Sequence, residues 1–354
     1  MSSGWVRRLS ELSRPPTGVD RLLRVWLADD RTAADDWADF ERDVDIDNLP
    51  CAEMCLVGLV SKRLPTIAST SGLRGRIGGI ERAGWSRTQL TVGEAAKALE
   101  LLATQDIPTL LVGSGARIAT GDALGRGLRI ENIEMCVHPA DFPRAQDLLI
   151  ANGWQFATPS AINRNHIQSV SSRRFVRGRF AAIELRQSPF PDPVSADFDA
   201  ITVWRRAVRG RLCEAAVLLP SPTDALAVAV ANGLRHSCFN SLWLADVAMA
   251  ACHGIDWQLF EEQCGRHGLE AAAFHSLLYA SDRLGRAVPG GTLGHLEKHA
   301  AKRTLHTLAL LLECRAGSRA TFVSRSMMRV ARRVRGFVTA HSASTSLTAD
   351  HRVS

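Results

Sequence analysis

The sequence predicts an α/β (α+β) fold, with a sheet-containing core flanked by an N-terminal and a C-terminal helical region. Residues 107–156 read as a strand, a glycine-serine turn, a helix, a second strand and a second helix. Strands and helices that alternate in this way are typical of an α/β core. The stretches before and after the core instead place apolar residues at helical spacing, which is the main sequence signal for helices.

The N-terminal region is predicted to be helical behind a short leader. Residues 1–17 hold several arginines and end near a Pro-Pro pair, and we expect a loose leader there. Residues 18–105 place apolar side chains at helical spacing. The acidic run of Asp43, Asp45 and Asp47 looks like a metal motif, but neither a glycine turn nor an apolar strand precedes it. We therefore interpret the run as a solvated helix end or turn.

The α/β core is predicted over residues 106–215 and begins with a short apolar strand at 109–112. A turn of Gly113, Ser114 and a further glycine follows this strand. A helix is expected over residues 116–123, and the amides at its start would face an anion.

Two further strands are predicted to carry polar side chains. Residues 130–137 alternate in polarity, so Asn132 and Glu134 should share one face of their strand, because side chains alternate along a strand. Glu184 lies in the apolar run 180–185, which we expect to be a strand. The sequence therefore predicts a core with acidic side chains on separate strands.

The chain after the core is predicted to return to helices. A C-terminal helical domain is expected over residues 216–316, starting where Ser221 or Thr223 can cap a helix. Residues 317–340 indicate a basic amphipathic helix. The Ser/Thr-rich residues 341–354 indicate a disordered tail.

The composition is that of a globular protein. Of the 354 residues, 46% are hydrophobic and 22% are charged, which argues against a disordered chain. No apolar run reaches the length of a membrane span, and the N-terminal residues lack the apolar centre of a signal peptide. The eight cysteines have no metal-ligand spacing, which fits reduced thiols. We expect a cytoplasmic protein.

The net charge of +7 comes largely from one basic segment near the C-terminus. Its five arginines alternate with apolar residues, and they are Arg325, Arg329, Arg332, Arg333 and Arg335. Such a helix could contact an anionic membrane surface or RNA. The plainer alternative is that its apolar side packs on the protein while the arginines face water.

A series of short motifs runs through residues 35–290 in a fixed order. The motifs are Ile107-Pro108, Gly113-Ser114, Arg129, Asn132-Ile133-Glu134, Pro139 with Asp141, Gly153-Trp154, Glu184-Leu185-Arg186, residues 219–224, Arg235-His236, residues 244–246 and residues 255–257. In order and spacing they resemble the type 5 family of uncharacterised bacterial nucleotidyltransferases, a branch of the polymerase-beta-like nucleotidyltransferase superfamily. The resemblance implies a nucleotidyltransferase-like core built on a mixed sheet.

The chain departs from the pattern of this family at four positions. Gly113 stands where the family has a lysine, and Asn132 stands where it has the first aspartate. Glu134 replaces the second aspartate, and Arg186 replaces a histidine. Because Mg²⁺ prefers carboxylate oxygens in near-octahedral geometry, the loss of one anionic ligand implies a weaker metal site. The acidic motif is therefore degenerate.

The resemblance implies roles for the matching residues. Glu134 and Glu184 would bind the expected cofactor, Mg²⁺, and act in catalysis, with Glu184 also serving as the general base on an acceptor hydroxyl. Residues with an implied role in nucleotide binding are Gly113, Ser114, Arg129 and Asn132.

Each implied role has a structural alternative. Gly113 could serve only a tight strand-to-helix turn that needs the backbone freedom of glycine. Glu134 or Glu184 could form a structural salt bridge with Arg129 or Arg186. The same carboxylates would then hold the fold together rather than a metal.

Several other side chains are weaker candidates for the site. Arg173, Arg174 and Arg177 could form an anion-binding rim, or they could lie in a solvated basic loop. His236 and Asp246 fall on helices that match the family and could face a cleft. A buried histidine held by a neighbouring helix is the commoner outcome.

The predicted function is transfer of a nucleotidyl group from an NTP to a hydroxyl or phosphate of an acceptor. The resemblance suggests a peptide or glycan precursor as the acceptor, because related proteins are encoded beside peptide-modification or polysaccharide genes. The alternative is an inactive scaffold or nucleotide-binding protein. The missing lysine and aspartate favour this alternative, whereas Glu134, Glu184 and the Gly-Ser turn oppose it. A third hypothesis is a nucleic-acid or membrane-surface protein acting through the C-terminal arginines.

Overall fold

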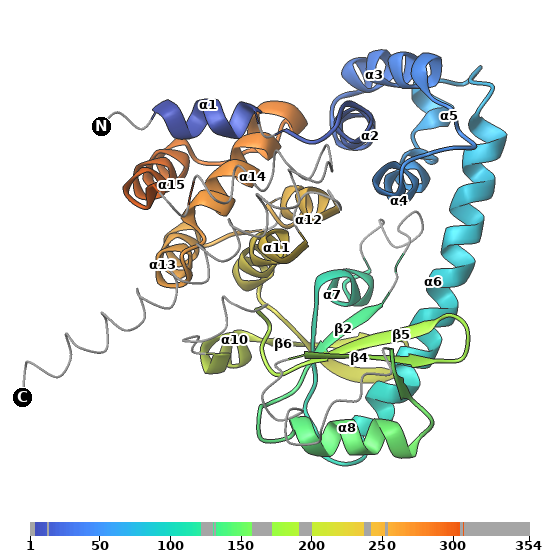
Figure 1. The fold of residues 1–354 in the computed structure, drawn as a ribbon, viewed down its shortest axis with the longest axis vertical. Helices are drawn as coiled ribbons and strands as arrows, with labels where there is room; N and C mark the ends of the chain where they lie inside the picture. Colours follow the sequence, from blue (N-terminus) through green and yellow to red (C-terminus); the bar gives the residue numbers. More distant parts are fainter. Residues whose placement is uncertain are drawn as a thin grey trace, which may run out of the picture. The chain divides into compact units, whose positions relative to one another are not determined.

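The computed structural model describes residues 4–12, 14–121, 130, 132–157, 172–190, 200–236, 242–251, 254–304 and 307. The chain folds into two compact units (Figure 1). One, here called the sheet unit, comprises residues 54–189 and 199–228. The other, here called the helical unit, comprises residues 1–53, 190–198 and 229–354.

The sheet unit contains all the strands of the described chain. They are β1 (Leu110–Val112), β2 (Ile133–Cys136), β3 (Gln155–Phe156), β4 (Ser172–Arg177), β5 (Ala181–Arg186), β6 (Val208–Leu212) and β7 (Ala215–Leu219). Its helices are α5 (Leu64–Ile67), α6 (Arg74–Ala103), α7 (Gly113–Ala119), α8 (Phe142–Ala151) and α10 (Ala200–Arg206). The helices α4 (Cys51–Val60) and α11 (Pro222–His236) each cross a boundary between the units.

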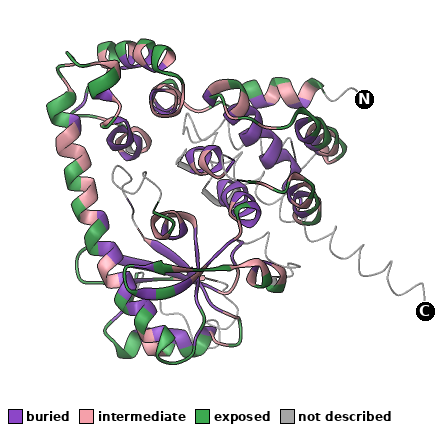
Figure 2. Ribbon diagram, turned by 180° about the vertical axis from the view of Figure 1, so that it is seen from behind, coloured by how far each residue is buried: buried purple, intermediate pink, exposed green. Residues whose placement is uncertain are grey.

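The strands form one mixed sheet in the order β3-β4-β5-β2-β1-β7-β6. The pairs β2·β5 and β1·β7 are parallel, whereas the other neighbouring pairs are antiparallel. The expected mixed-sheet α/β core is therefore confirmed. Every residue of the central strands β1, β2 and β5 is buried (Figure 2), as expected for strands covered on both faces.

Helices cover this sheet on both sides. The helices α7 and α8 lie on opposite sides of it (Figure 1). The long helix α6 contacts β2, β5 and β7. On this helix, the hydroxyl of Thr91 donates a hydrogen bond of 3.0 Å to the carbonyl of Phe180, which directly precedes β5. The central strands can therefore carry polar side chains only where these side chains find partners.

The helical unit is built from short helices at the two ends of the chain. They are α1 (Gly4–Leu12), α2 (Thr17–Leu27), α3 (Asp30–Asp43), α12 (Leu242–Ala250), α13 (Trp257–His267), α14 (Glu270–Leu284) and α15 (Gly290–Lys302). Asp29 and Asp256 cap α3 and α13, since their carboxylates accept hydrogen bonds from backbone amides three residues later. The helices α13 and α14 end at Gly268 and Gly285, whose φ angles of 64° and 65° favour glycine.

A part-buried polar cluster joins α2 to α14 within the helical unit. The Tyr279 hydroxyl donates a hydrogen bond of 2.7 Å to Asp20 Oδ1, and Arg283 Nη2 donates one of 2.6 Å to Asp20 Oδ2. On α2 and α3, Arg24 pairs with Asp36 at 2.9 Å. The two hydrogen bonds to Asp20 connect residues more than 250 positions apart in the sequence.

The structure corrects several sequence expectations. The loose leader expected over residues 1–17 instead contains α1, in which Val6 and Ser10 are buried. The helix expected over 116–123 begins at Gly113, directly after β1, and ends at Ala119. The three successive regions expected along the chain also differ from the two units, because the N-terminal helices belong with the C-terminal helices and α6 belongs with the sheet.

Other expectations are confirmed. The acidic run is a helix end and turn, in which Asp43 pairs with Arg21 and Asp45 accepts hydrogen bonds from Asp47 N and Asn48 Nδ2. Ser221 caps α11 by accepting from the backbone amide of Asp224 at 3.2 Å. The predicted basic helix at 317–340 and tail at 341–354 lie outside the described residues.

No helix in the described part of the chain combines the length and apolarity needed to cross a membrane.

Candidate functional site

The candidate site lies on one face of the two central strands β2 and β5. These strands run parallel, and Glu134 is registered with Glu184, while Cys136 is registered with Arg186. Side chains two residues apart on a strand point to the same face. One patch on the sheet therefore contains the two glutamates, the cysteine and the arginine. The two strands that carry them are about 50 residues apart in the sequence.

Arg186 lies between the two carboxylates. Its Nη2 is 2.9 Å from Glu134 Oε1, and its Nε donates a hydrogen bond of 3.2 Å to Glu184 Oε1. The contact with Glu134 is an ion pair without the alignment of a hydrogen bond. Only 1% of Arg186 is exposed, against 8% of Glu134 and 7% of Glu184. The structural salt bridge weighed in the sequence analysis is therefore confirmed for Arg186.

The two glutamates keep Arg186 charged. Burial alone would lower the pKa of Arg186, but the carboxylates of Glu134 and Glu184 outweigh it, so that the pKa is raised. A buried guanidinium needs such partners, because an unpaired buried charge destabilises the folded state. Removing one partner of a buried ion pair lowers the free energy of unfolding by about 3–5 kcal/mol. The three side chains thus depend on one another.

Asn132 and Ser114 lie beside this cluster. Asn132 Nδ2 donates a hydrogen bond of 3.2 Å to Glu184 Oε2, and the Ser114 hydroxyl donates a long one of 3.4 Å to the carbonyl of Asn132. The start of α7 is thereby connected to β2 and, through Asn132, to β5. The structure brings four of the predicted site residues together: Ser114, Asn132, Glu134 and Glu184.

The two glycines around Ser114 have different structural tasks. Gly113 has a φ of 57°, a conformation that side chains rarely adopt. A Cβ atom at Gly115 would lie 3.0 Å from Ile133 Cγ2, so this glycine allows α7 to pack closely on β2. The predicted turn role of Gly113 is borne out by its backbone, while nucleotide binding by Gly113 and Ser114 stays a prediction.

Cys136 completes the patch as a neutral thiol. Burial, opposed by Arg186 and reinforced by the two glutamates, raises the pKa of Cys136 to about 12. The thiol donates a hydrogen bond of 3.3 Å to the carbonyl of Ser188. Since a nucleophile or metal ligand must be a thiolate, Cys136 has a packing role at neutral pH.

The arrangement does not fit a divalent metal ion. Mg²⁺ prefers several free carboxylate or phosphate oxygens in octahedral geometry. Here Arg186 contacts both carboxylates, and the Asn132 amide directs its NH₂ group at Glu184. Glu134 Oε2 is buried without a hydrogen-bond partner, which leaves one oxygen uncommitted. In the described part of the chain, no group of three or more His, Cys, Asp or Glu side chains could hold a metal ion.

The predicted arginine rim is divided between the two faces of the sheet. Arg174 is registered with Glu184, so it lies on the face of the carboxylates, and it is exposed. Arg173 and Arg177 point to the opposite face, where Arg177 lies 3.5 Å from Glu94 of α6. Of the three predicted rim residues, only Arg174 borders the site.

The other predicted residues lie outside the described residues or in the other unit. Arg129 and the side chain of His236 lie outside the described residues. Asp246 lies on α12 in the helical unit. Their predicted roles in binding stay predictions.

Sequence reasoning missed a buried ion pair at the start of α11. Arg206 donates hydrogen bonds of 3.0 Å and 2.6 Å to the two oxygens of Asp224, which is fully buried and also accepts from the Ser221 hydroxyl. A capping serine followed three residues later by an acid was the available signal. Nothing in the sequence indicated that Arg206 would be the partner.

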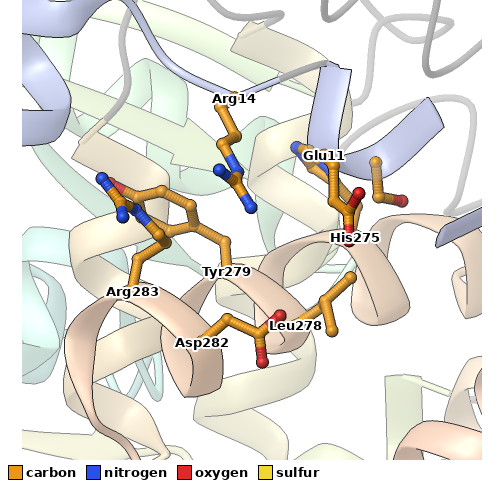
Figure 3. Close-up of a pocket in the computed structure, with 8 residues that line it drawn as sticks. Glu11, Arg14, His275, Leu278, Tyr279, Asp282 and Arg283 are labelled. Atoms are coloured by element: carbon orange, nitrogen blue, oxygen red, sulfur yellow. The ribbon is translucent and has the colours of Figure 1, made fainter. Parts of the chain in front are cut away.

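The helical unit holds a small pocket between α1 and α14. Figure 3 shows the residues that line it, among them Glu11 on α1, Arg14 just beyond it, and His275, Leu278, Tyr279, Asp282 and Arg283 on α14. The pocket has a volume of about 10 Å³, which leaves room for a single water molecule. Small-molecule sites span roughly 300–1,000 Å³, so this pocket does not accommodate a nucleotide.

The mixed sheet, the helix that starts directly after β1 and the acidic face of β2 and β5 define a nucleotidyltransferase-like α/β protein. A family model described as "uncharacterised nucleotidyltransferase" matches residues 51–285. The chain belongs to this family, as the motifs predicted. The match includes every strand of the sheet and the acidic cluster. No curated protein and no solved structure matches the chain.

Proposed function

We propose that this chain is a nucleotide-binding member of the nucleotidyltransferase family that lacks metal-dependent nucleotidyl transfer. The observation that carries the proposal is the position of Arg186 between Glu134 and Glu184. Arginine stays protonated at any physiological pH, so its charge is permanently available to both carboxylates. Nucleotide binding itself is inferred from family membership.

The competition between Arg186 and a metal ion has a physical scale. A divalent ion would have to separate a buried guanidinium from two buried carboxylates. Breaking a buried ion pair costs about 3–5 kcal/mol, which corresponds to a loss in metal affinity of roughly 10²- to 10⁴-fold. Asn132 adds to this loss because its oxygen lacks the charge of a carboxylate.

A second candidate function is nucleotidyl transfer to a hydroxyl or phosphate of an acceptor, such as a peptide or glycan precursor. Two observations favour it: the glutamates are registered side by side, and Glu134 Oε2 is buried without a hydrogen-bond partner. This candidate requires Arg186 to leave both carboxylates before Glu134 and Glu184 could bind Mg²⁺ or act in catalysis.

Metal binding by a reverted variant separates the two candidates. Free Mn²⁺ is measured by electron paramagnetic resonance in titrations of wild type and of Asn132→Asp/Arg186→His, which introduces the residues that the family resemblance expects. We expect the double variant to bind Mn²⁺ under conditions in which wild type does not. Adding Glu134→Ala to the double variant is the matched control and should abolish the binding.

Nucleotide binding is tested by titration calorimetry with the four common NTPs, with and without Mg²⁺. We expect wild type to bind at least one NTP with an affinity that Mg²⁺ does not increase, and to transfer no label from an α-labelled NTP. Mn²⁺ binding by wild type that Glu134→Ala abolishes would favour the transferase. An absence of NTP binding by folded protein would refute nucleotide binding.

A further inference from the structure

Arg174 is an exposed cation at the edge of the buried acidic cluster. The antiparallel pairing of β4 with β5 places Arg174 opposite Glu184 and Ser172 opposite Arg186. Directly opposite residues on neighbouring strands have Cβ atoms about 4.5–5.5 Å apart on the same face. Arg174 is therefore a direct neighbour of Glu184.

Arg174 nevertheless forms no ion pair with Glu184. The carboxylate of Glu184 accepts from Arg186 Nε through Oε1 and from Asn132 Nδ2 through Oε2. Throughout the described structure, the side chain of Arg174 takes part in neither a hydrogen bond nor an ion pair. Its guanidinium is thus uncommitted beside the site, whereas the guanidinium of Arg186 is committed within it.

The charge balance of the face depends on Arg174. Glu134 and Glu184 carry two negative charges, and Arg186 compensates one of them. A phosphate group that approaches this face without Arg174 would meet a net charge of −1. With Arg174 the local charge is zero, and an exposed fork of N–H donors faces the incoming anion.

We propose that Arg174 binds the phosphate groups of the nucleotide, in the role that a divalent cation has in metal-dependent sites. This inference rests on the nucleotide binding proposed above and names the residue that receives the ligand. The ligand class is a nucleoside di- or triphosphate without a bound metal. Arg173 and Arg177 are excluded from this role because they lie on the opposite face of β4.

The test compares two arginines of the same strand that face opposite ways. Adenosine, AMP, ADP and ATP are titrated by calorimetry into wild type, Arg174→Ala and Arg177→Ala in buffer free of divalent ions. A hydrogen bond to a charged group is worth about 1.5–3 kcal/mol, so Arg174→Ala should weaken ADP and ATP binding by roughly 10- to 100-fold. Arg177→Ala should leave these affinities unchanged, and circular dichroism checks that both variants are folded.

Two further comparisons make the test specific. Adenosine should bind Arg174→Ala and wild type equally, since it carries no phosphate. Arg174→Lys should restore only part of the ATP affinity, because an ammonium group lacks the planar donor fork of arginine. Added salt should weaken ATP binding to wild type more than to Arg174→Ala, because an exposed charge pair is screened.

The possible outcomes separate this inference from the proposal on which it rests. If wild type binds ATP and Arg174→Ala binds it equally well, the role of Arg174 is refuted while nucleotide binding stands. An equal loss in Arg177→Ala, or a loss that extends to adenosine, would also refute it. If wild type binds neither these ligands nor any of the four common NTPs, both proposals fail together.

Discussion

The Nη2 atom of Arg186 lies 2.9 Å from Glu134 Oε1 on the neighbouring parallel strand. This contact, with the second one to Glu184, places a positive charge at the centre of the acidic patch. A metal ion there would exchange with the solvent, whereas the guanidinium is attached to β5. The cluster therefore contributes to the stability of the sheet as well as to the chemistry of the site.

Replacing Arg186 by methionine should strongly destabilise the sheet unit. The substitution leaves two buried carboxylates without a counter-charge, and the expected loss in the free energy of unfolding is about 3–5 kcal/mol. The measurement is urea-induced unfolding followed by circular dichroism. Arg211→Met is the control, because Arg211 forms an exposed pair with Glu214 and should cost less than about 1 kcal/mol.

The origin of this loss can be separated from the loss of packing. The variant Glu134→Gln/Glu184→Gln/Arg186→Met removes all three charges and should be more stable than Arg186→Met alone, since it leaves no buried charge without a counter-charge. A triple variant that is even less stable would mean that the packing of Arg186, not its charge, holds the strands.

The helical unit should lose stability as the pH falls from about 6.5 to about 4. Burial lowers the pKa of His275 from 6.5 to about 4, so the unfolded chain takes up a proton before the folded chain does. Stability contributed by neutral His275 is present above pH 6.5 and is lost through this window, on the order of 3 kcal/mol in total. Chemical unfolding at a series of pH values measures it.

His275→Asn is the control for this pH dependence. Its stability should decline less steeply than that of wild type between pH 6.5 and 4. Burial also lowers the pKa of His267 to about 4, so His267→Gln should remove a second part of the slope. Identical slopes in wild type and His275→Asn would contradict the prediction.

Tyr279 should resist ionisation for as long as the helical unit stays folded. Burial first, and then the Asp20 carboxylate to which its hydroxyl donates, raise the pKa of Tyr279 well above 10. Tyr279 is the single tyrosine of the chain, so the near-ultraviolet absorbance of tyrosinate reports on it alone.

The measurement is an absorbance titration to alkaline pH, with circular dichroism recorded in parallel. We expect tyrosinate to form only as the helical signal is lost, and Asp20→Asn to shift its formation to lower pH. Ionisation near pH 10 in protein that is still helical would show that Tyr279 is accessible to water.

The described cysteines should differ sharply in reactivity. Cys213 is exposed in the turn between β6 and β7, whereas Cys55, Cys136 and Cys264 are buried. Burial raises the pKa of Cys136 to about 12 and that of Cys264 well above 9, and only thiolates react readily. Alkylation followed by peptide mass spectrometry should label Cys213 in native protein and the other three only after unfolding. Labelling of native Cys136 would contradict its place in the buried cluster.

The neighbourhood of Glu134 and Glu184 could be anticipated from the sequence. Alternation along two apolar strands assigns each glutamate to a face, and the family resemblance, which gives both glutamates to one metal ion, predicts that they lie close together. The same alternation puts Arg186 on the face of Glu184, because the two are two positions apart. That Arg186 contacts both glutamates depends on the register between β2 and β5. This register cannot be predicted from a single sequence.

Other features of the fold could not be predicted from local sequence patterns. The start of α7 at Gly113 follows from the close approach of Gly115 to Ile133, which is a tertiary contact. The arginines of β4 looked like one basic rim, but a strand sends neighbouring side chains to opposite faces. The helix α1 was missed because its buried face, with Val6 and Ser10, is narrow and its other residues are polar.

The bonds from Asp20 to Tyr279 and Arg283 also set an order for folding on the ribosome. Asp20 emerges 263 residues before Arg283, a delay of roughly 10 to 50 s at about 5–20 residues per second. The sheet unit ends at residue 228 and can be complete before then. The helices α2 and α3 can pack on each other early, but the contacts of α1 and α2 with α14, and of α1 with α15, must wait until those late helices are made. During translation, α1 and α2 should therefore stay accessible to chaperones for longer than the sheet unit does.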